Sequence, residues 1–220
     1  MTAEERHQYM LEVQQTRECA EAAVALSAEQ GFPFWLAWGT MPAGLGIAEQ
    51  GSREEGIAQM RDGLTSYQAA GAAFGCPYFL ALLAQAHANA GQANAGLGVL
   101  ADPLAGASNT GERYYEAELH RLEKELLLQR FGTQPCMSSD HEAPEAFSHK
   151  AIMIARQQGA KWLELGASLS LARLWGQLGK TEAARQALVG IQGAFTEWVD
   201  TADWQQGKRL LDALSPEHDA

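Results

Sequence analysis

The sequence lacks the features that mark several large classes of protein. It has no run of about 20 apolar residues, which a membrane-spanning helix needs. Residues 1–6, MTAEER, lack the basic stretch and the apolar core of a secretory signal, so we expect a cytoplasmic protein. Only 3 cysteines occur in 220 residues and none forms a CxxC pair, so we expect reduced and mostly buried thiols.

Basic residues are scarce as well. The 16 lysines and arginines face 27 aspartates and glutamates, which gives a formal net charge of −11. An acidic surface repels phosphate groups, so we expect neither nucleic acid nor a membrane surface as a partner. β-Branched residues are few and alanines and leucines are many, a composition that favours packed helices over sheets.

Sequence motifs for catalysis are also missing. No GxSxG, HExxH or CxxC pattern occurs. The string nearest to a phosphate-binding loop is Gly179-Lys180-Thr181, but Leu174 stands where the first glycine of that motif belongs. We therefore expect no enzyme activity, no catalytic residue, no metal and no cofactor, and we keep an enzyme with a novel site only as the weakest of three hypotheses.

What the sequence does contain is a repeat. A glycine followed within a few residues by aromatic side chains recurs along the chain, at Gly31, Gly75, Gly111 and Gly159, with a weaker copy ending at Trp204. The spacing averages about 42 residues, which predicts a two-helix repeat somewhat longer than the ~34-residue tetratricopeptide unit.

Glycine turns and apolar stripes support this division into helix pairs. Gly51, Gly91 and Gly179 are placed where one helix would end and the next begin, and glycine suits the residue just past a helix end. Apolar residues then recur at intervals of three and four, as at 184, 188, 191, 195 and 198. One helix cannot bury such a stripe alone, so stacked hairpins must do it together.

The predicted fold is all-α: a right-handed α-α superhelix, a tetratricopeptide-like solenoid of about ten helices in one domain over residues 1–220. Its units lie roughly at 1–50, 51–90, 91–131, 145–179 and 180–214, with an inserted loop at 132–144. Pro42 and Pro103 fall inside predicted helices, where proline removes a hydrogen bond, so we expect a kink or a break at both.

Two short motifs resemble those of tetratricopeptide repeats. Trp162-x-x-Leu165-Gly166-x-x-Leu169 is similar to the W-x-x-L-G-x-x-Y signature, with leucine in place of tyrosine. The string GSREEGI at 51–57 is similar to the G-D-Y-x-E-A-I turn. The resemblance implies that the first helix of each pair lines a concave groove in which a protein or peptide binds.

Four longer phrases resemble one particular context. They are EQGFPFWLAWGT at 29–40, AEQGSREEGIAQMRDGL at 48–64, GERYYEAELHRLEKELLL at 111–128 and FTEWVDTADWQQGKRLLDAL at 195–214. They are similar to the C-terminal helical repeats of large bacterial signalling proteins, which carry an adenylate/guanylate cyclase or DNA-binding domain and then a STAND-type ATPase. The resemblance covers about residues 17–214 of this chain, and only the repeat region of that family.

Candidate binding residues lie on one predicted helix. Glu116, His120 and Glu123 occupy positions i, i+4 and i+7, beside its apolar stripe. Carboxylate and imidazole groups on one face could bind a metal. We favour a solvated flank at the edge of the concave groove instead, where a peptide with a basic residue between apolar ones would bind.

Two other groups of residues admit a ligand-binding hypothesis. A metal site is conceivable around the inserted loop, with ligands from Cys136, His141, Glu142, Glu145 and His149, although no zinc module has this spacing and a polar loop is favoured. The 6 tryptophans could stack on a ligand, but their helical spacing favours packing in the core.

The sequence thus favours a non-catalytic protein–protein interaction module with a protein or peptide ligand in its groove. The alternative is a regulatory or sensor tail of a bacterial cyclase or STAND ATPase, acting in cis or as a split gene product on those domains. The coding sequence upstream of Met1 would separate these two hypotheses.

Overall fold

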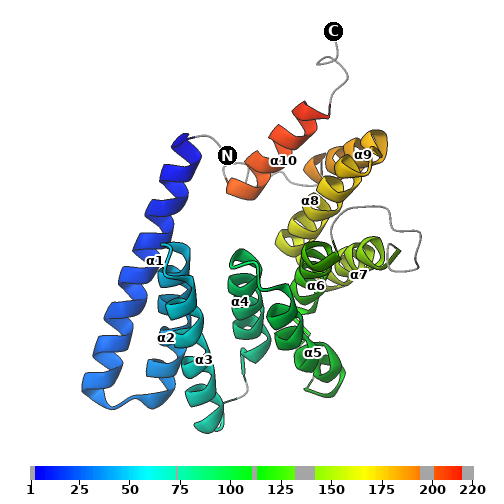
Figure 1. Cartoon of the computed structure of the whole chain (residues 1–220). Helices are drawn as coiled ribbons and strands as arrows, with labels where there is room; N and C mark the ends of the chain where they lie inside the picture. The colour runs from blue at the N-terminus through cyan, green and yellow to red at the C-terminus, as the bar shows by residue number, and fades with distance from the viewer. Residues whose placement is uncertain (1–2, 73, 111–112, 132–141, 194–200, 215–220) are drawn as a thin grey trace. The chain divides into compact units, whose positions relative to one another are not determined.

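The computed structural model describes residues 3–72, 74–110, 113–131, 142–193 and 201–214. Within these ranges, side chains are described except at 3–13, 102–110, 142–143, 192 and 202. The described residues form ten α-helices and no strand, which confirms the all-helical prediction (Figure 1). Among the described residues, none of these helices is long and apolar enough to cross a membrane.

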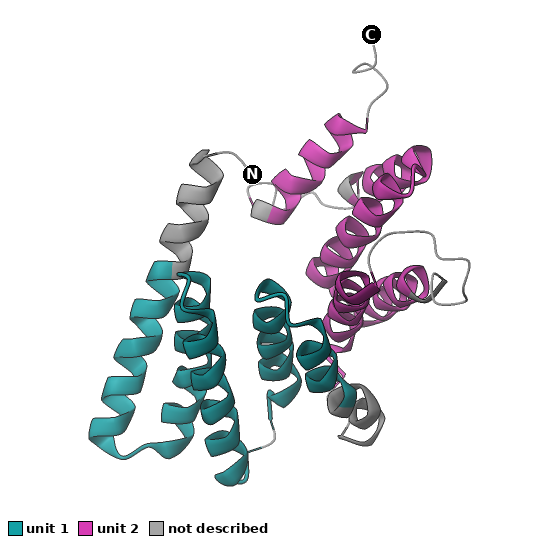
Figure 2. Cartoon of the chain, viewed as in Figure 1, with its two compact units in different colours: residues 1–112 teal, residues 113–220 magenta. Residues whose placement is uncertain are grey.

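The chain divides into two compact units, residues 1–112 and 113–220 (Figure 2). The first unit contains α1 Ala3–Gln30, α2 Pro33–Glu49, α3 Arg53–Ala69, α4 Cys76–Asn89 and α5 Ala93–Thr110. The second contains α6 Glu116–Phe131, α7 Glu142–Gln158, α8 Lys161–Gln177, α9 Thr181–Gly193 and α10 Ala202–Ala213. The last residues of the predicted 132–144 loop are therefore helical, while 132–141 lie outside the described residues.

The turns between paired helices contain glycines with a left-handed backbone. Gly51, Gly91 and Gly179 have φ angles of 112°, 75° and 72°. Because glycine has no Cβ, it adopts positive φ without the steric penalty that other residues meet. The chain reverses at these glycines to begin α3, α5 and α9, as the sequence predicted.

Helix contacts follow one rule within each unit. Helices that follow one another in the chain pack together, as α2 does with α3 and α8 with α9. Even-numbered helices also contact the next even-numbered helix: α2 contacts α4, α6 contacts α8, and α8 contacts α10. Each unit therefore has a layer of even-numbered helices, which begin at the glycine–aromatic joints of the sequence.

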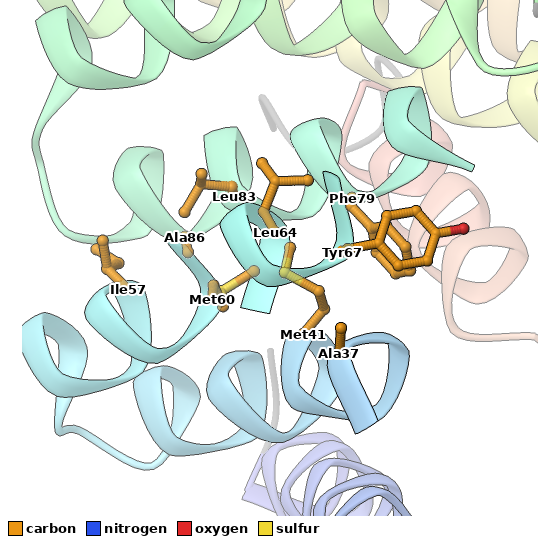
Figure 3. Close-up of a cluster of buried hydrophobic side chains, with 9 residues drawn as sticks. All are labelled: Ala37, Met41, Ile57, Met60, Leu64, Tyr67, Phe79, Leu83 and Ala86. Carbon is orange, nitrogen blue, oxygen red and sulfur yellow. The ribbon is translucent and has the colours of Figure 1, made fainter. Parts of the chain in front are cut away.

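The core of the first unit lies between α2, α3 and α4 (Figure 3). Ile57, Met60, Leu64 and Tyr67, which recur at intervals of three and four along α3, are all buried. The Tyr67 hydroxyl donates a hydrogen bond of 2.5 Å to the backbone carbonyl of Phe74, so this buried polar group is satisfied.

Helix α2 is rich in glycine because both neighbouring helices approach it closely. A Cβ on Gly46 would lie 2.7 Å from Arg17 Cβ of α1, and a Cβ on Gly44 would lie 2.7 Å from Met60 Cγ of α3. Two helices can reach α2 at these points because the side chains are absent. Of the kink or break predicted at Pro42, the break does not occur: α2 continues from Pro33 to Glu49, and this packing on both sides offsets the lost hydrogen bond.

A similar core in the second unit lies between α8, α9 and α10. Its buried residues are Leu165, Leu169, Ala172, Ala184, Leu188 and Ile191. The predicted α9 stripe is confirmed at its first three positions, while 195 and 198 lie outside the described residues. Helix α5 continues through Pro103, so of the kink or break predicted there the break does not occur either.

Two tryptophans lie outside the core, contrary to prediction. Trp35 is 57% exposed and Trp162 is 53% exposed, whereas Trp38, Trp175 and Trp204 are half-buried against core residues. Trp35 and Trp162 stand in the first turn of their helices. Helical side chains tilt toward the N-terminus, so these indoles project past the end of the helix instead of onto the neighbouring one.

Candidate functional site

The residues predicted to form a binding site lie on α6 but not on an open surface. Glu116 is 9% exposed and accepts a hydrogen bond of 2.7 Å from Arg113 Nε. His120 is 4% exposed, with Nδ1 3.1 Å from Glu123 Oε2, and its ring stacks on Phe147 of α7. The expectation of an exposed flank is therefore wrong for Glu116 and His120, because α7 and α8 both pack against α6.

A larger group of charged residues surrounds Arg121, also on α6. The Arg121 guanidinium forms two hydrogen bonds with Glu118, of 2.7 and 2.6 Å, and a third of 2.6 Å with Glu125. Its side chain is only 16% exposed. A two-pronged arginine–carboxylate pair fixes orientation as well as charge, so Arg121 holds both glutamates in place.

Beneath this pair lies a buried lysine. Lys124 is 2% exposed, and its Nζ donates a hydrogen bond of 3.0 Å to the backbone carbonyl of Ser170 on α8 and another to the Ser170 hydroxyl. The Ser170 hydroxyl in turn donates to Glu125 Oε1 at 2.9 Å. These contacts join α6 to α8 across 46 residues of sequence.

The pKa values of these groups reflect their burial and their neighbours. Burial lowers the pKa of Lys124 from 10.5 to about 8, helped by the positive charges of Arg121 and Arg173 and opposed by Glu125. Burial acts to raise the pKa of Glu125, but Arg121, Lys124 and the Ser170 hydrogen bond lower it overall. The charged form of Lys124 is thus destabilised in the folded protein, whereas the charged form of Glu125 is stabilised.

Helix α10 contributes one more charge to this group. Burial raises the pKa of Asp203, although Arg121 and Arg173 favour its charged form. The ionic cluster, as we call it, therefore draws on α6, α8 and α10, and consists of Glu118, Arg121, Lys124, Glu125, Ser170, Arg173 and Asp203. The three basic side chains of this set match the three acidic ones in number.

The hydrogen bonds within the ionic cluster indicate a structural role for Ser170 and Lys124. A serine beside a lysine of lowered pKa can act as a nucleophile and base, but that requires the lysine to accept the serine proton. Here the Ser170 hydroxyl donates to Glu125, and Lys124 donates to Ser170. Ser170 and Lys124 are each 2% exposed, so their contacts stabilise the seam between α6 and α8.

The first unit carries a different kind of surface, built from aromatic rings. Phe34 and Trp38 of α2 and Tyr78 of α4 pack against the same buried core, Trp35 lies beside Phe34, and we call these four residues the aromatic surface. The Phe34 ring is 5.0 Å from Trp35 and 6.2 Å from Trp38, measured between centroids. Trp35 is exposed and the other three are half-buried, and burial raises the pKa of Tyr78. The sequence analysis assigned the two tryptophans of this surface to the core.

The aromatic surface rests on a rigid base. Trp38 meets Phe79 edge-on at 4.6 Å, and the Tyr67 ring lies 5.2 Å from Phe34 and 5.4 Å from Phe79. Both Tyr67 and Phe79 are fully buried, at 0% exposure (Figure 3). Exposed rings supported by a packed aromatic core keep their positions, which lowers the entropy lost when a partner binds.

Helices α2 and α4 run parallel and side by side beneath this surface. Their N-terminal halves meet where Trp38 contacts Phe79, and their last residues meet where Asn89 Nδ2 donates to Glu49 Oε1 at 2.6 Å. Along α2, the half-buried residues that follow the tryptophans include Pro42 and Leu45. The first unit therefore presents a continuous two-helix surface whose first turns are aromatic.

Metal ligands do not gather in the part of the chain that the structure describes. Within it, no three histidine, cysteine, aspartate or glutamate side chains lie together as a metal site requires. Of the predicted loop cluster, Cys136 and His141 lie outside the described residues, as does the side chain of Glu142. Glu145 pairs with Lys180, and the His149 ring lies 5.8 Å from that of Trp175.

No known protein-family model matches this chain, and no curated protein matches it either.

Proposed function

We propose that this chain is a non-catalytic, tetratricopeptide-type interaction module that binds a protein or peptide segment. The helix pairs, the glycine turns and the contacts between successive even-numbered helices support a right-handed superhelix of hairpins. In such an array the even-numbered helices line the concave groove, because helices on the inner side of a curve lie closer together than those on the outer side.

The observation that carries the proposal is the exposure of the aromatic surface. Trp35 leaves 57% of its surface in water, although burying it would contribute more than burying almost any other side chain. Phe32, the residue immediately before α2, is 53% exposed. Clustered exposed aromatics mark interaction sites, and tryptophan and tyrosine are frequent among the residues that dominate binding energy.

The aromatic surface replaces Glu116, His120 and Glu123 as the leading candidate for the docking site. Glu116 and His120 are buried and hydrogen-bonded within the second unit. Trp35 and Trp38 also lie on an even-numbered helix, but they reach solvent. A partner would place an apolar side chain among the rings of α2 and α4.

A second candidate function is that of a regulatory tail of a bacterial cyclase or STAND ATPase. The four sequence phrases at 29–40, 48–64, 111–128 and 195–214 favour it. In that case the docked segment belongs to a cyclase or ATPase domain in the cytoplasm, encoded upstream in the same frame or in a neighbouring gene.

The proposal is tested by selecting peptides from a displayed random library on the purified chain. We expect selected peptides to bind the wild type and to lose about tenfold or more in affinity for Trp35→Ala. Trp162→Ala is the matched control, because Trp162 is also a first-turn tryptophan and is 53% exposed. Failure to select any binder, or equal affinity for the wild type and Trp35→Ala, would contradict the proposal.

A further inference from the structure

We infer that the segment docked on the aromatic surface is cationic and places an arginine or lysine side chain against the Trp35 indole. This inference rests on the proposed function and adds the chemistry of the partner. It follows from the charge of the first unit, from the position of its few basic residues and from the rings that Trp35 offers.

The first unit is strongly acidic. Residues 1–112 contain four arginines, no lysine and twelve carboxylate side chains, a formal net charge of −8. Residues 113–220 contain twelve basic and fifteen acidic side chains, a net charge of −3. Most of the negative charge of the protein thus belongs to the unit that carries the aromatic surface, and a unit of this net charge attracts a positive segment and repels a negative one.

Two of the three described arginines of the first unit lie away from Trp35, and the third, Arg61, lies in the middle of α3. Arg17 hydrogen-bonds Gln50, just past the last residue of α2, and Arg53 begins α3 close by. Trp35 is near the opposite end of α2, and about 15 residues of helix separate the two ends by roughly 22 Å. That separation exceeds the Debye length of about 8 Å at physiological salt, so these two cations do not shield the aromatic surface.

The rings themselves favour a cation. The π face of tryptophan is negative and attracts guanidinium and ammonium groups more strongly than tyrosine or phenylalanine does. Phe34 and Trp38 approach Trp35 in edge-to-face geometry, with interplanar angles of 87° and 64°. A side chain docked there meets a group of rings, where apolar stems of arginine or lysine also pack well.

The second unit provides an internal contrast. Trp162 is almost as exposed as Trp35, but it directly follows Lys161, whose side chain is 59% exposed. Arg156 is nearby as well, because Arg156 and Lys161 both pair with Glu164. A cationic segment would therefore meet positive charge beside Trp162. The unit that contains Trp35 has no lysine.

The test uses a short synthetic peptide of glycine, serine and leucine that carries two arginines, labelled for fluorescence anisotropy. Two versions replace both arginines, one with citrulline, which has the same shape without the charge, and one with glutamate. We expect the arginine peptide to bind the full chain, the citrulline peptide to bind about tenfold more weakly, and the glutamate peptide not to bind. Affinity of the arginine peptide should fall as salt is raised.

Two variants of the chain locate the effect. Trp35→Leu should lower affinity for the arginine peptide about tenfold, and Trp162→Leu should leave it within about twofold. Trp35→Phe keeps a ring with a weaker negative face, so it should lower the affinity by an intermediate amount. This variant replaces Trp35→Leu in the test if circular dichroism shows that Trp35→Leu is unfolded.

Equal binding of the citrulline or glutamate peptide would overturn the inference, as would absence of binding by the arginine peptide or insensitivity to both Trp35 variants. The proposed function is judged separately by the displayed library. If the library yields neutral or acidic binders that depend on Trp35, the function stands and the cationic partner is wrong.

Discussion

Gly56 of α3 lies so close to Gly44 of α2 that neither position has room for a side chain. A Cβ on Gly56 would fall 2.5 Å from the Ala48 nitrogen and 2.7 Å from its Cβ, and closer still to the Gly44 carbonyl oxygen. Backbone cannot move aside as a flexible side chain can. We therefore expect Gly56→Ala to lower the free energy of unfolding by about 2–3 kcal/mol in chemical denaturation.

The control is Gly98→Ala on α5, where nothing lies within 4 Å of the added Cβ. Alanine is the better helix former there, so we expect a gain of about 0.5–1 kcal/mol. Opposite signs for the two substitutions are the result that the close approach of α2 and α3 requires. Destabilisation by both to the same degree would show that the helix contact is misplaced.

The buried stripe of α9 gives a second prediction. Leu188 is fully buried, so Leu188→Ala should cost about 2–5 kcal/mol, the usual range for removing a buried leucine side chain. Trp162→Ala should cost about 1 kcal/mol or less, because more than half of that indole is already in water. Thermal and chemical unfolding of both variants measure this, and equal losses would contradict the assigned core.

The contrast between Leu188 and Trp162 shows what the sequence could predict. Apolar spacing of three and four located Leu188 correctly, because it reports the face of a helix. The same spacing placed Trp162 in the core, because it does not report where the neighbouring helix ends. The glycine turns were predictable for a local reason, the positive φ that follows a helix end.

The candidate site was much harder to predict than the fold. The spacing of Glu118, Arg121 and Glu125 on one helix was a usable signal for an ion-pair network. The contact between Lys124 and Ser170 was not, since 46 residues separate them and no local pattern couples the two. Burial of Glu116 and His120 likewise depends on α7 and α8 packing around α6.

Arg121 is the residue on which the ionic cluster depends. Arg121→Met keeps much of the side-chain volume but removes the charge that holds Glu118 and Glu125, whose side chains are 18% and 29% exposed. We expect a loss of about 2–3 kcal/mol in unfolding free energy, because two partly buried carboxylates lose their cation.

Arg185→Met is the matched control for Arg121→Met. Arg185 also pairs with a glutamate three residues earlier, Glu182, but on an exposed surface. Exposed pairs contribute little because water and salt screen them, so no measurable change is expected there. A loss at Arg185 as large as that at Arg121 would count against a buried cluster.

Lys124 makes stability depend on pH in the alkaline range. Burial lowers its pKa to about 8 from 10.5, so between these values the unfolded chain holds a proton that the folded chain has released. Raising the pH through this range therefore favours the folded state. Relative to Lys124→Met, the wild type should gain up to about 3 kcal/mol between about pH 7 and pH 10.

Comparison with Lys124→Met removes the contribution of groups that titrate in both proteins, Tyr78 among them. Urea unfolding at a series of pH values gives the difference directly. A difference that stays flat or falls with rising pH would show that the Lys124 amine is charged and well stabilised in the folded protein.

The central claim, that a protein segment docks on the aromatic surface, is tested most directly by the indole N–H signals in the NMR spectrum. Each of the 6 tryptophans gives one such signal, assigned by single Trp→Phe variants. On saturation with a selected peptide, the signals of Trp35 and Trp38 should shift while those of Trp162 and Trp204 stay in place. Shifts at Trp162 or Trp204 with Trp35 and Trp38 unmoved would contradict the account.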